Sequence, residues 1–90
     1  ELEPVGFNIN VYPNPVSDDQ LNIDYEIKQN SKITFSVVDI VGKLIYAANE
    51  KQVAGKYQKK ITLENLAPGV YFLTVNVNNI IRSFKLVKIH

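Results

Sequence analysis

Few side chains in this sequence could perform catalytic chemistry, and their positions do not favour it. A nucleophilic serine needs a positioned base and a third group that orients the base. The only histidine, His90, is the last residue, where no packing would fix its ring, so no serine has an expected partner. The carboxylates of Asp18 and Asp19 neighbour each other in one turn rather than facing each other across a cleft. We predict that the protein is not an enzyme.

Ligands for a metal ion or a cofactor are also sparse. Asn14, Asp18 and Asp19 could offer oxygen atoms to calcium, but their spacing is far from that of a defined calcium loop. The chain has no cysteine, which excludes disulfide bonds and thiolate ligands but leaves the cellular compartment open. We therefore expect no metal and no cofactor.

Composition limits the other classes of function. The formal net charge of +1 argues against a dedicated nucleic-acid-binding protein. No apolar run approaches the roughly 20 residues that span a bilayer, and residues 1–6 lack the pattern of a signal peptide. Ninety residues with 46% hydrophobic content suit one globular domain. Because the sequence does not start with methionine, we expect it to be a piece of a longer protein.

The elements that position the remaining polar groups are expected to be strands, because apolar residues recur with a period of two. The clearest examples are residues 21–27 and 33–37, where apolar and polar side chains alternate. About seven short strands predict an all-β fold, an immunoglobulin-like antiparallel β-sandwich. The expected strands cover residues 7–12, 21–27, 33–37, 44–46, 57–63, 70–77 and 80–89.

Three parts of the chain carry more specific expectations. Residues 70–77 are apolar on both faces for most of their length, which predicts a central strand that is covered on both sides. Residues 49–56 are polar and contain Gly55, which predicts a loop. Lys59 is the exception on an otherwise apolar alternating face.

Proline, glycine and asparagine mark the strand ends. Residues 13–15, Pro-Asn-Pro, lack two backbone N–H groups and exclude helix, so the first strand must stop there. Gly42 is expected to take the positive φ of a tight hairpin. Residues 68–69, Pro-Gly, predict a turn with positive φ at the glycine, and residues 78–79, Asn-Asn, predict another hairpin. Tyr71 is the candidate for a tyrosine corner, in which the hydroxyl bonds back to the backbone a few residues upstream.

Four segments, in this order, resemble the C-terminal sorting domain of type IX secretion cargo in Bacteroidetes. They are residues 11–15 (VYPNP), 39–43 (DIVGK), 66–71 (LAPGVY) and 84–88 (FKLVK), and the resemblance extends from about residue 7 to residue 88. The positions that match the family pattern are Pro13, Asn14, Pro15, Gly42, Lys43, Gly69, Val70, Tyr71, Lys85 and Lys88.

The resemblance implies an immunoglobulin-like domain fused behind a passenger such as a protease, a glycoside hydrolase or an adhesin. Residues 1–6 would be the linker to this passenger, and residues 7–90 would be the sorting domain. The passenger would reach the periplasm, and the outer-membrane translocon would recognise the domain. A sortase-like protease would then remove it, leaving the passenger at the cell surface or in the medium. The resemblance implies neither binding to nucleic acid nor a membrane-spanning segment.

The last strand is the expected docking element. A terminal edge strand can offer backbone groups to a partner sheet, and lysines on that edge prevent indiscriminate pairing while attracting an acidic partner. Replacing both lysines is expected to leave the fold intact and to impair export, whereas Gly69 and Tyr71 are expected to be structural. The predicted recognition residues are Lys85, Leu86, Val87 and Lys88.

Other interpretations of the sequence stay open. The main alternative is a non-catalytic immunoglobulin-like binding module that holds a glycan or a protein, for which Tyr12, Tyr46 and Tyr57 are candidate contacts. An inert spacer is less favoured, because a spacer needs something on both sides. An exposed terminal strand would also allow a homodimer.

Overall fold

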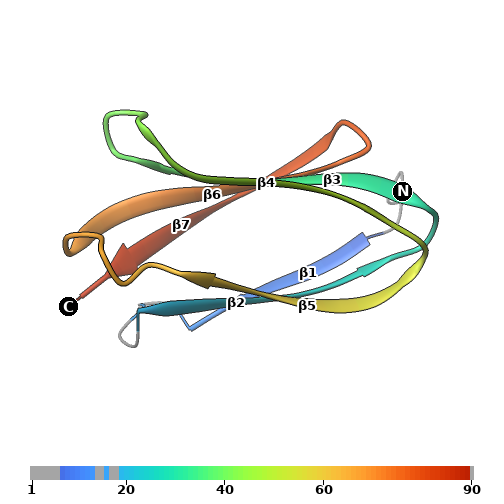
Figure 1. Cartoon of the computed structure of the whole chain (residues 1–90), viewed down its shortest axis with the longest axis horizontal. Coiled ribbons are helices and arrows are strands. Elements are labelled where there is room, and N and C mark those ends of the chain that lie inside the picture. The colour runs from blue at the N-terminus through green and yellow to red at the C-terminus, as the bar shows by residue number, and fades with distance from the viewer. Residues whose placement is uncertain (1–6, 14–15, 17–18, 90) are drawn as a thin grey trace, which may run out of the picture.

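The strands of the protein form two antiparallel sheets that face each other (Figure 1). The computed structural model describes residues 7–13, 16 and 19–89, within which the only helices or strands are seven strands. One sheet has the order β1-β2-β5 and the other the order β4-β3-β6-β7. The predicted all-β, immunoglobulin-like sandwich is therefore confirmed. The strands are β1 (Phe7–Tyr12), β2 (Gln20–Ile27), β3 (Ser31–Asp39), β4 (Leu44–Gln52), β5 (Gly55–Thr62), β6 (Gly69–Val77) and β7 (Ile80–Lys88).

The core lies between the sheets and consists of the inward members of each alternating strand. Leu21 and Ile23 of β2 are fully buried in one cluster with Phe35 of β3 and Leu73 of β6. Since successive side chains of a strand point to opposite faces, the period of two in the sequence places these residues inside together. Burial of each such side chain stabilises the fold by about 1.5–3 kcal/mol. No helix in the described residues has the length and hydropathy of a membrane span.

Two of the predicted turns are present, at Gly42 and at residues 78–79, whereas the turn expected at residues 68–69 lies earlier, at residues 63–66. β1 ends at Tyr12, directly before residues 13–15, of which only Pro13 lies within the described residues. Gly42 has a φ of +89° between β3 and β4, and Gly69 has a φ of +154° where β6 begins. Asn78 and Asn79 have φ values of +51° and +74° between β6 and β7. Positive φ at Gly42, Asn78 and Asn79 lets the chain reverse within a few positions.

Two expectations about the strands were wrong. Residues 49–56 do not form a loop, because β4 continues to Gln52 and β5 starts at Gly55. β4 lies at the edge of its sheet, where polar side chains are tolerated, so its composition resembles that of a loop. β6 is central in its sheet but is not covered on both faces, since Phe72 on its outer face is 38% exposed. A two-layer sandwich supplies nothing to cover that face.

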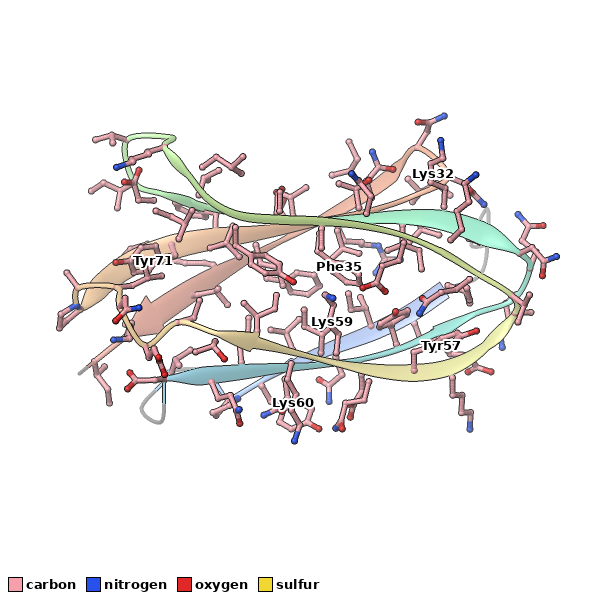
Figure 2. The ribbon with its side chains drawn as sticks, in the orientation of Figure 1. Lys32, Phe35, Tyr57, Lys59, Lys60 and Tyr71 are labelled. Atoms are coloured by element: carbon pink, nitrogen blue, oxygen red, sulfur yellow. The ribbon has the colours of Figure 1, made fainter. Side chains whose placement is uncertain are left out.

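The sandwich is closed by different contacts along its two sides. On one side Lys59 of β5 points between the sheets, where its ammonium group lies 2.6 Å from the Glu50 carboxylate of β4 and 5.2 Å from the centre of the Phe35 ring (Figure 2). On the other side Val16 pairs with β7: its N–H donates to the carbonyl of Val87 at 2.7 Å, and its carbonyl accepts from the N–H of Ile89 at 3.2 Å.

Candidate recognition site

Three of the four segments that carry the family resemblance lie far apart in the chain but meet at one end of the sandwich, which we call the motif end. β6 is the centre of this arrangement, because Tyr71 pairs with Asp39 of β3 on one side and with Leu86 of β7 on the other. Gly69 pairs with Lys88 in the same ladder. In Figure 1 the β3–β4 turn, the start of β6 and the chain's C-terminal end lie together at the left. The motif end consists of residues 38–44, 66–72 and 84–89, with Val16.

The β3–β4 turn is held by the side chain of Asp39. Its carboxylate accepts the N–H of Val41 at 3.0 Å and the N–H of Lys43 at 2.9 Å. The N–H of Gly42 donates to the Asp39 carbonyl at 3.0 Å, and positive φ at Gly42 completes the reversal. The turn presents Lys43 and Gly42 to solvent. The role of Asp39 was not predicted, although aspartate at the start of a turn commonly bonds backbone groups a few residues on.

The tyrosine corner is present as predicted. The hydroxyl of Tyr71 donates to the carbonyl of Ala67 at 2.6 Å, and the side chain is only 6% exposed. This bond ties the β5–β6 connection to the start of β6 (Figure 2). Of the neighbouring motif residues, Gly69 is exposed and Val70 is half-buried on the outer face of the sheet.

The two lysines of the last strand have different surroundings, which corrects the expectation that both lie on the surface. Lys88 is only 4% exposed; its ammonium group donates to the carbonyl of Leu66 at 2.7 Å and pairs with the Asp19 carboxylate at 3.0 Å. Lys85 is exposed. Strand alternation explains the difference, because Leu86 and Lys88 point inward whereas Lys85 and Val87 point outward. Lys88 thus joins β7 to two other segments of the chain.

β7 is the outer strand of its sheet, as predicted. Its C-terminal part, however, is paired on both sides, with β6 on one and with Val16 on the other. Val16 follows residues 13–15 and is fully buried. β1 ends at Tyr12, and four positions later the chain is joined to the end of β7 by Val16. Nothing local in the sequence marks this bridge, which is why it was not predicted.

The calcium ligands considered from the sequence are only partly within the described residues. Asn14 and Asp18 lie outside them, and Asp19 pairs with Lys88 instead. Within the described part of the chain, no group of three histidine, cysteine, aspartate or glutamate residues could hold a metal ion.

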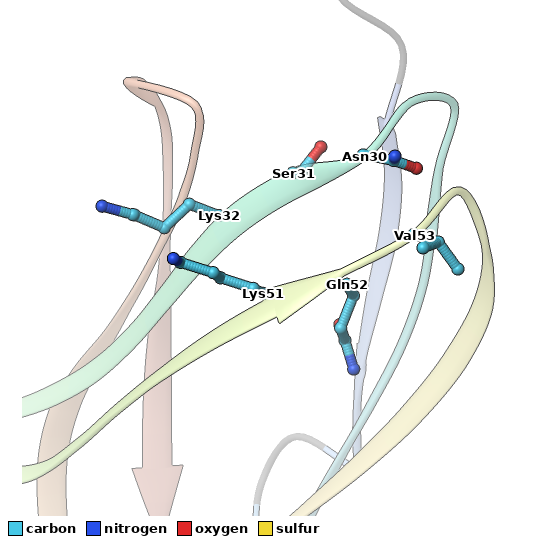
Figure 3. Close-up of a pocket in the computed structure, with 6 residues that line it drawn as sticks. All are labelled: Asn30, Ser31, Lys32, Lys51, Gln52 and Val53. Atoms are coloured by element: carbon cyan, nitrogen blue, oxygen red, sulfur yellow. The ribbon is translucent and has the colours of Figure 1, made fainter.

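The tyrosines that would favour a binding module do not share one surface. Tyr57 and Tyr46 pack against the core, and Tyr57 stacks on Tyr25 with 5.5 Å between ring centres. Tyr12 donates to the Asp24 carboxylate at 2.9 Å. A hollow of about 370 Å³ at the opposite end of the sandwich is lined by no aromatic residue (Figure 3).

Fold and site together define a small immunoglobulin-like sandwich in which separate sequence motifs build one end. The model of the secretion system C-terminal sorting domain family matches residues 10–89. The chain belongs to this family, whose domains are the sorting signals of type IX secretion in Bacteroidetes. Such a domain is a non-catalytic tail, and its presence implies export to the cell surface or the extracellular space.

Solved structures share the fold. The crystal structure of dimeric latent PorU from Porphyromonas gingivalis matches with a TM-score of 0.74 at 15% identity, over 98% of this chain and 10% of the PorU chain. A β-glucosidase from Listeria innocua, in complex with glucose, matches with a TM-score of 0.59 at 14% identity, over 97% of this chain and 16% of the enzyme. The chain therefore spans only a small part of either protein. No curated protein sequence matches it.

Proposed function

We propose that this domain carries an attached passenger protein across the outer membrane by presenting its motif end to the type IX translocon. The observation that supports the proposal most directly is the convergence of the motif segments. Residues 39–43, 66–71 and 84–88 are neighbours at one end of the four-stranded sheet, and Val16 joins the end of β7 just after residues 13–15. A surface assembled from three of the four family segments is the natural place for a receptor to recognise the family.

The recognition residues divide into two roles in this proposal. Lys85 and Val87 face outward and contribute contacts, and Lys43 contributes a second charge from the β3–β4 turn. Leu86 and Lys88 are buried and hold the end of β7 in place. The other described motif residues shape the turns and strand ends around these contacts: Pro13, Gly42, Gly69, Val70 and Tyr71. Asn14 and Pro15 lie outside the described residues.

The remaining steps follow from the role of a sorting domain. Residues 1–6 are the linker and residues 7–90 the sorting domain. The passenger, with its own export signal, passes through the periplasm, and a sortase-like protease cuts within or before the linker at the cell surface. The passenger is then released or stays attached to the surface. The domain itself performs no catalysis and needs no cofactor.

A binding module is the second candidate, and one observation favours it. On the outer face of the three-stranded sheet, the Gln58 amide donates to the Tyr12 hydroxyl at 3.2 Å and to the Asp24 carboxylate at 3.1 Å. A preorganised cluster of this kind could bond sugar hydroxyls. A glycan array with the isolated domain tests this function: it would show specific binding for a binding module and none for a sorting signal.

A homodimer is also compatible with the fold, because β7 is an edge strand that could pair with its counterpart in a second copy. Sedimentation equilibrium of the isolated domain would show whether such a dimer forms.

The sorting function is tested by fusing residues 1–90 to a fluorescent protein directed to the periplasm of a Bacteroidetes host. Reporter at the surface or in the medium supports the proposal, and reporter retained in the periplasm contradicts it. A truncation before Lys85 is a poor control, since it would also remove the buried Leu86 and Lys88. Leu73→Asp, which places a charge in the core, is a clearer control for a domain that cannot fold.

A further inference from the structure

The outer faces of the two sheets differ in chemistry. Outward positions of the three-stranded sheet carry polar side chains, for example Asn10, Asp24 and Gln58, which are adjacent in register. On the four-stranded sheet, Leu44, Val38 and Phe72 form a row across β4, β3 and β6, next to Lys85 of β7. We call the apolar part of this sheet the apolar half-face. It consists of Val38, Leu44, Val70, Phe72 and Val87 on the strands, together with Ile40 in the adjoining β3–β4 turn.

The apolar half-face is exposed at the motif end. Ile40, Leu44 and Phe72 are 70%, 57% and 38% exposed, and a hollow of about 450 Å³ opens beside them between the β3–β4 turn and the start of β6. Further along the same face most outward residues are polar, as in the pair Thr74 and Ser83, although Ile81 is an exposed exception. Single exposed apolar residues are ordinary, but a contiguous row on one half of a sheet indicates an interaction surface.

The charged side chains on the outer face of the four-stranded sheet are all lysines. The charged residues at outward strand positions of the four-stranded sheet are Lys32, Lys51 and Lys85; Lys32 and Lys51 extend side by side in Figure 3. Lys43 adds a further exposed ammonium group in the β3–β4 turn. The nearby carboxylate of Asp39 accepts backbone N–H groups of that turn.

This charge pattern indicates what kind of partner fits. Two copies packed face to face would bring lysines against lysines, which costs free energy in a desolvated contact. A partner with an apolar patch and carboxylates at its rim would instead match both features. We infer that the apolar half-face docks an acidic protein surface of the export machinery. The inference rests on the proposed function, since it names the face of the sorting domain that the export machinery binds.

The first test removes the apolar contacts without disturbing the core. The fusion of residues 1–90 carries Leu44→Ser together with Phe72→Ser, and the matched control carries Val53→Ser with Ile81→Ser. The control residues are 63% and 60% exposed and lie away from the motif end. We expect exported reporter to fall about tenfold or more for the first pair, as for truncated contacts at the centre of an interface. The control pair should leave export unchanged, and both isolated variants should give the far-UV circular dichroism of the unmodified domain.

The second test reverses charge. Lys43→Glu with Lys85→Glu should reduce export, whereas Lys56→Glu with Lys60→Glu, on the outer face of the other sheet, should not. Binding of the isolated domain to phosphatidylglycerol vesicles, abolished by Leu44→Ser with Phe72→Ser, would overturn the inference in favour of an anionic lipid surface. A dimer in solution that the same pair dissociates would overturn it in favour of self-association.

The outcomes separate this inference from the proposal on which it rests. Normal export of the folded Leu44→Ser, Phe72→Ser fusion contradicts the apolar half-face as the docking surface but leaves the sorting function standing. Absence of export for the unmodified fusion contradicts the sorting function itself.

Discussion

Lys85 and Lys88 are three positions apart and have opposite environments. The ammonium group of Lys88 is buried against the Leu66 carbonyl and the Asp19 carboxylate, whereas Lys85 is exposed on the outer face. The alternation of side chains along β7 explains this difference. Position 88 lies two residues after the buried Leu86, so both side chains point to the same, inward face. A lysine in an inward position indicates a bonded ammonium group rather than a surface charge.

The first prediction follows from this difference. Lys88→Met keeps the apolar stem but leaves the Leu66 carbonyl and Asp19 without this ammonium partner. We expect the free energy of unfolding to fall by about 1–3 kcal/mol, less than for a fully buried ion pair because Asp19 is partly solvated. Lys85→Met should change it by about 0.5 kcal/mol or less. Urea denaturation of both variants measures this, and equal losses would contradict the distinct roles.

The second prediction concerns the tyrosine corner. Tyr71→Phe removes the hydroxyl that donates to Ala67 while keeping the buried ring. The expected loss is about 1–2 kcal/mol, which lowers the melting temperature by roughly 4–8 °C per kcal/mol in a domain of this size. Thermal melts followed by circular dichroism would show it. A variant that melts normally but fails to export would make Tyr71 a contact residue instead of a structural one.

Among the elements, β4 and β5 show how contacts between edge strands join the two sheets along one side of the sandwich. Both are edge strands, and Lys59 is placed between the sheets by its inward position in β5. Burial lowers the pKa of Lys59, but hydrogen bonds to Glu50 and Tyr46 outweigh it, so the pKa lies above its ordinary value of 10.5. Burial also raises the pKa of Tyr25 above its ordinary value of 10.0, and the Glu50 carboxylate adds to the rise.

These shifts give the third prediction. A group whose pKa is raised by folding contributes stability below its unfolded pKa and loses it as the pH rises through the folded value. The contributions of Tyr25 and Lys59 should therefore be constant from about pH 7 to 9 and decline above about pH 10. Urea denaturation across this pH range measures the decline in the free energy of unfolding. The control is the double variant Tyr25→Phe, Lys59→Met, which lacks both titrating groups. An unchanged alkaline loss in the double variant would contradict the assignment.

Strands were the most predictable part of the fold, and long-range pairings the least. The period of two located the buried residues of β2 and β3, and Pro, Gly and Asn located most of the turns. The polar composition of β4 hid a regular strand, because an edge strand need not be apolar on both faces. The Val16 bridge and the partners of Lys88 depend on how distant segments meet. No local pattern in the sequence specifies those contacts.

At the scale of the whole molecule, the sandwich brings three of the four family segments to one end and leaves the apolar half-face uncovered beside them. Two independent features thus lie on the same face of the domain: the meeting of the family segments, and outward charged positions that are all lysines. The sequence motifs are sufficient to indicate the sorting function. The apolar half-face is not evident from those motifs, because it depends on the register that aligns Leu44, Val38 and Phe72 across three strands.

The most direct test of the sorting function compares the 1–90 fusion in two hosts, one with an intact type IX translocon and one in which the translocon is disabled. We predict reporter at the surface or in the medium of the first host and reporter confined to the periplasm of the second, with the domain folded in both. Export that does not depend on the translocon, or retention in both hosts, would contradict a role as a type IX sorting signal.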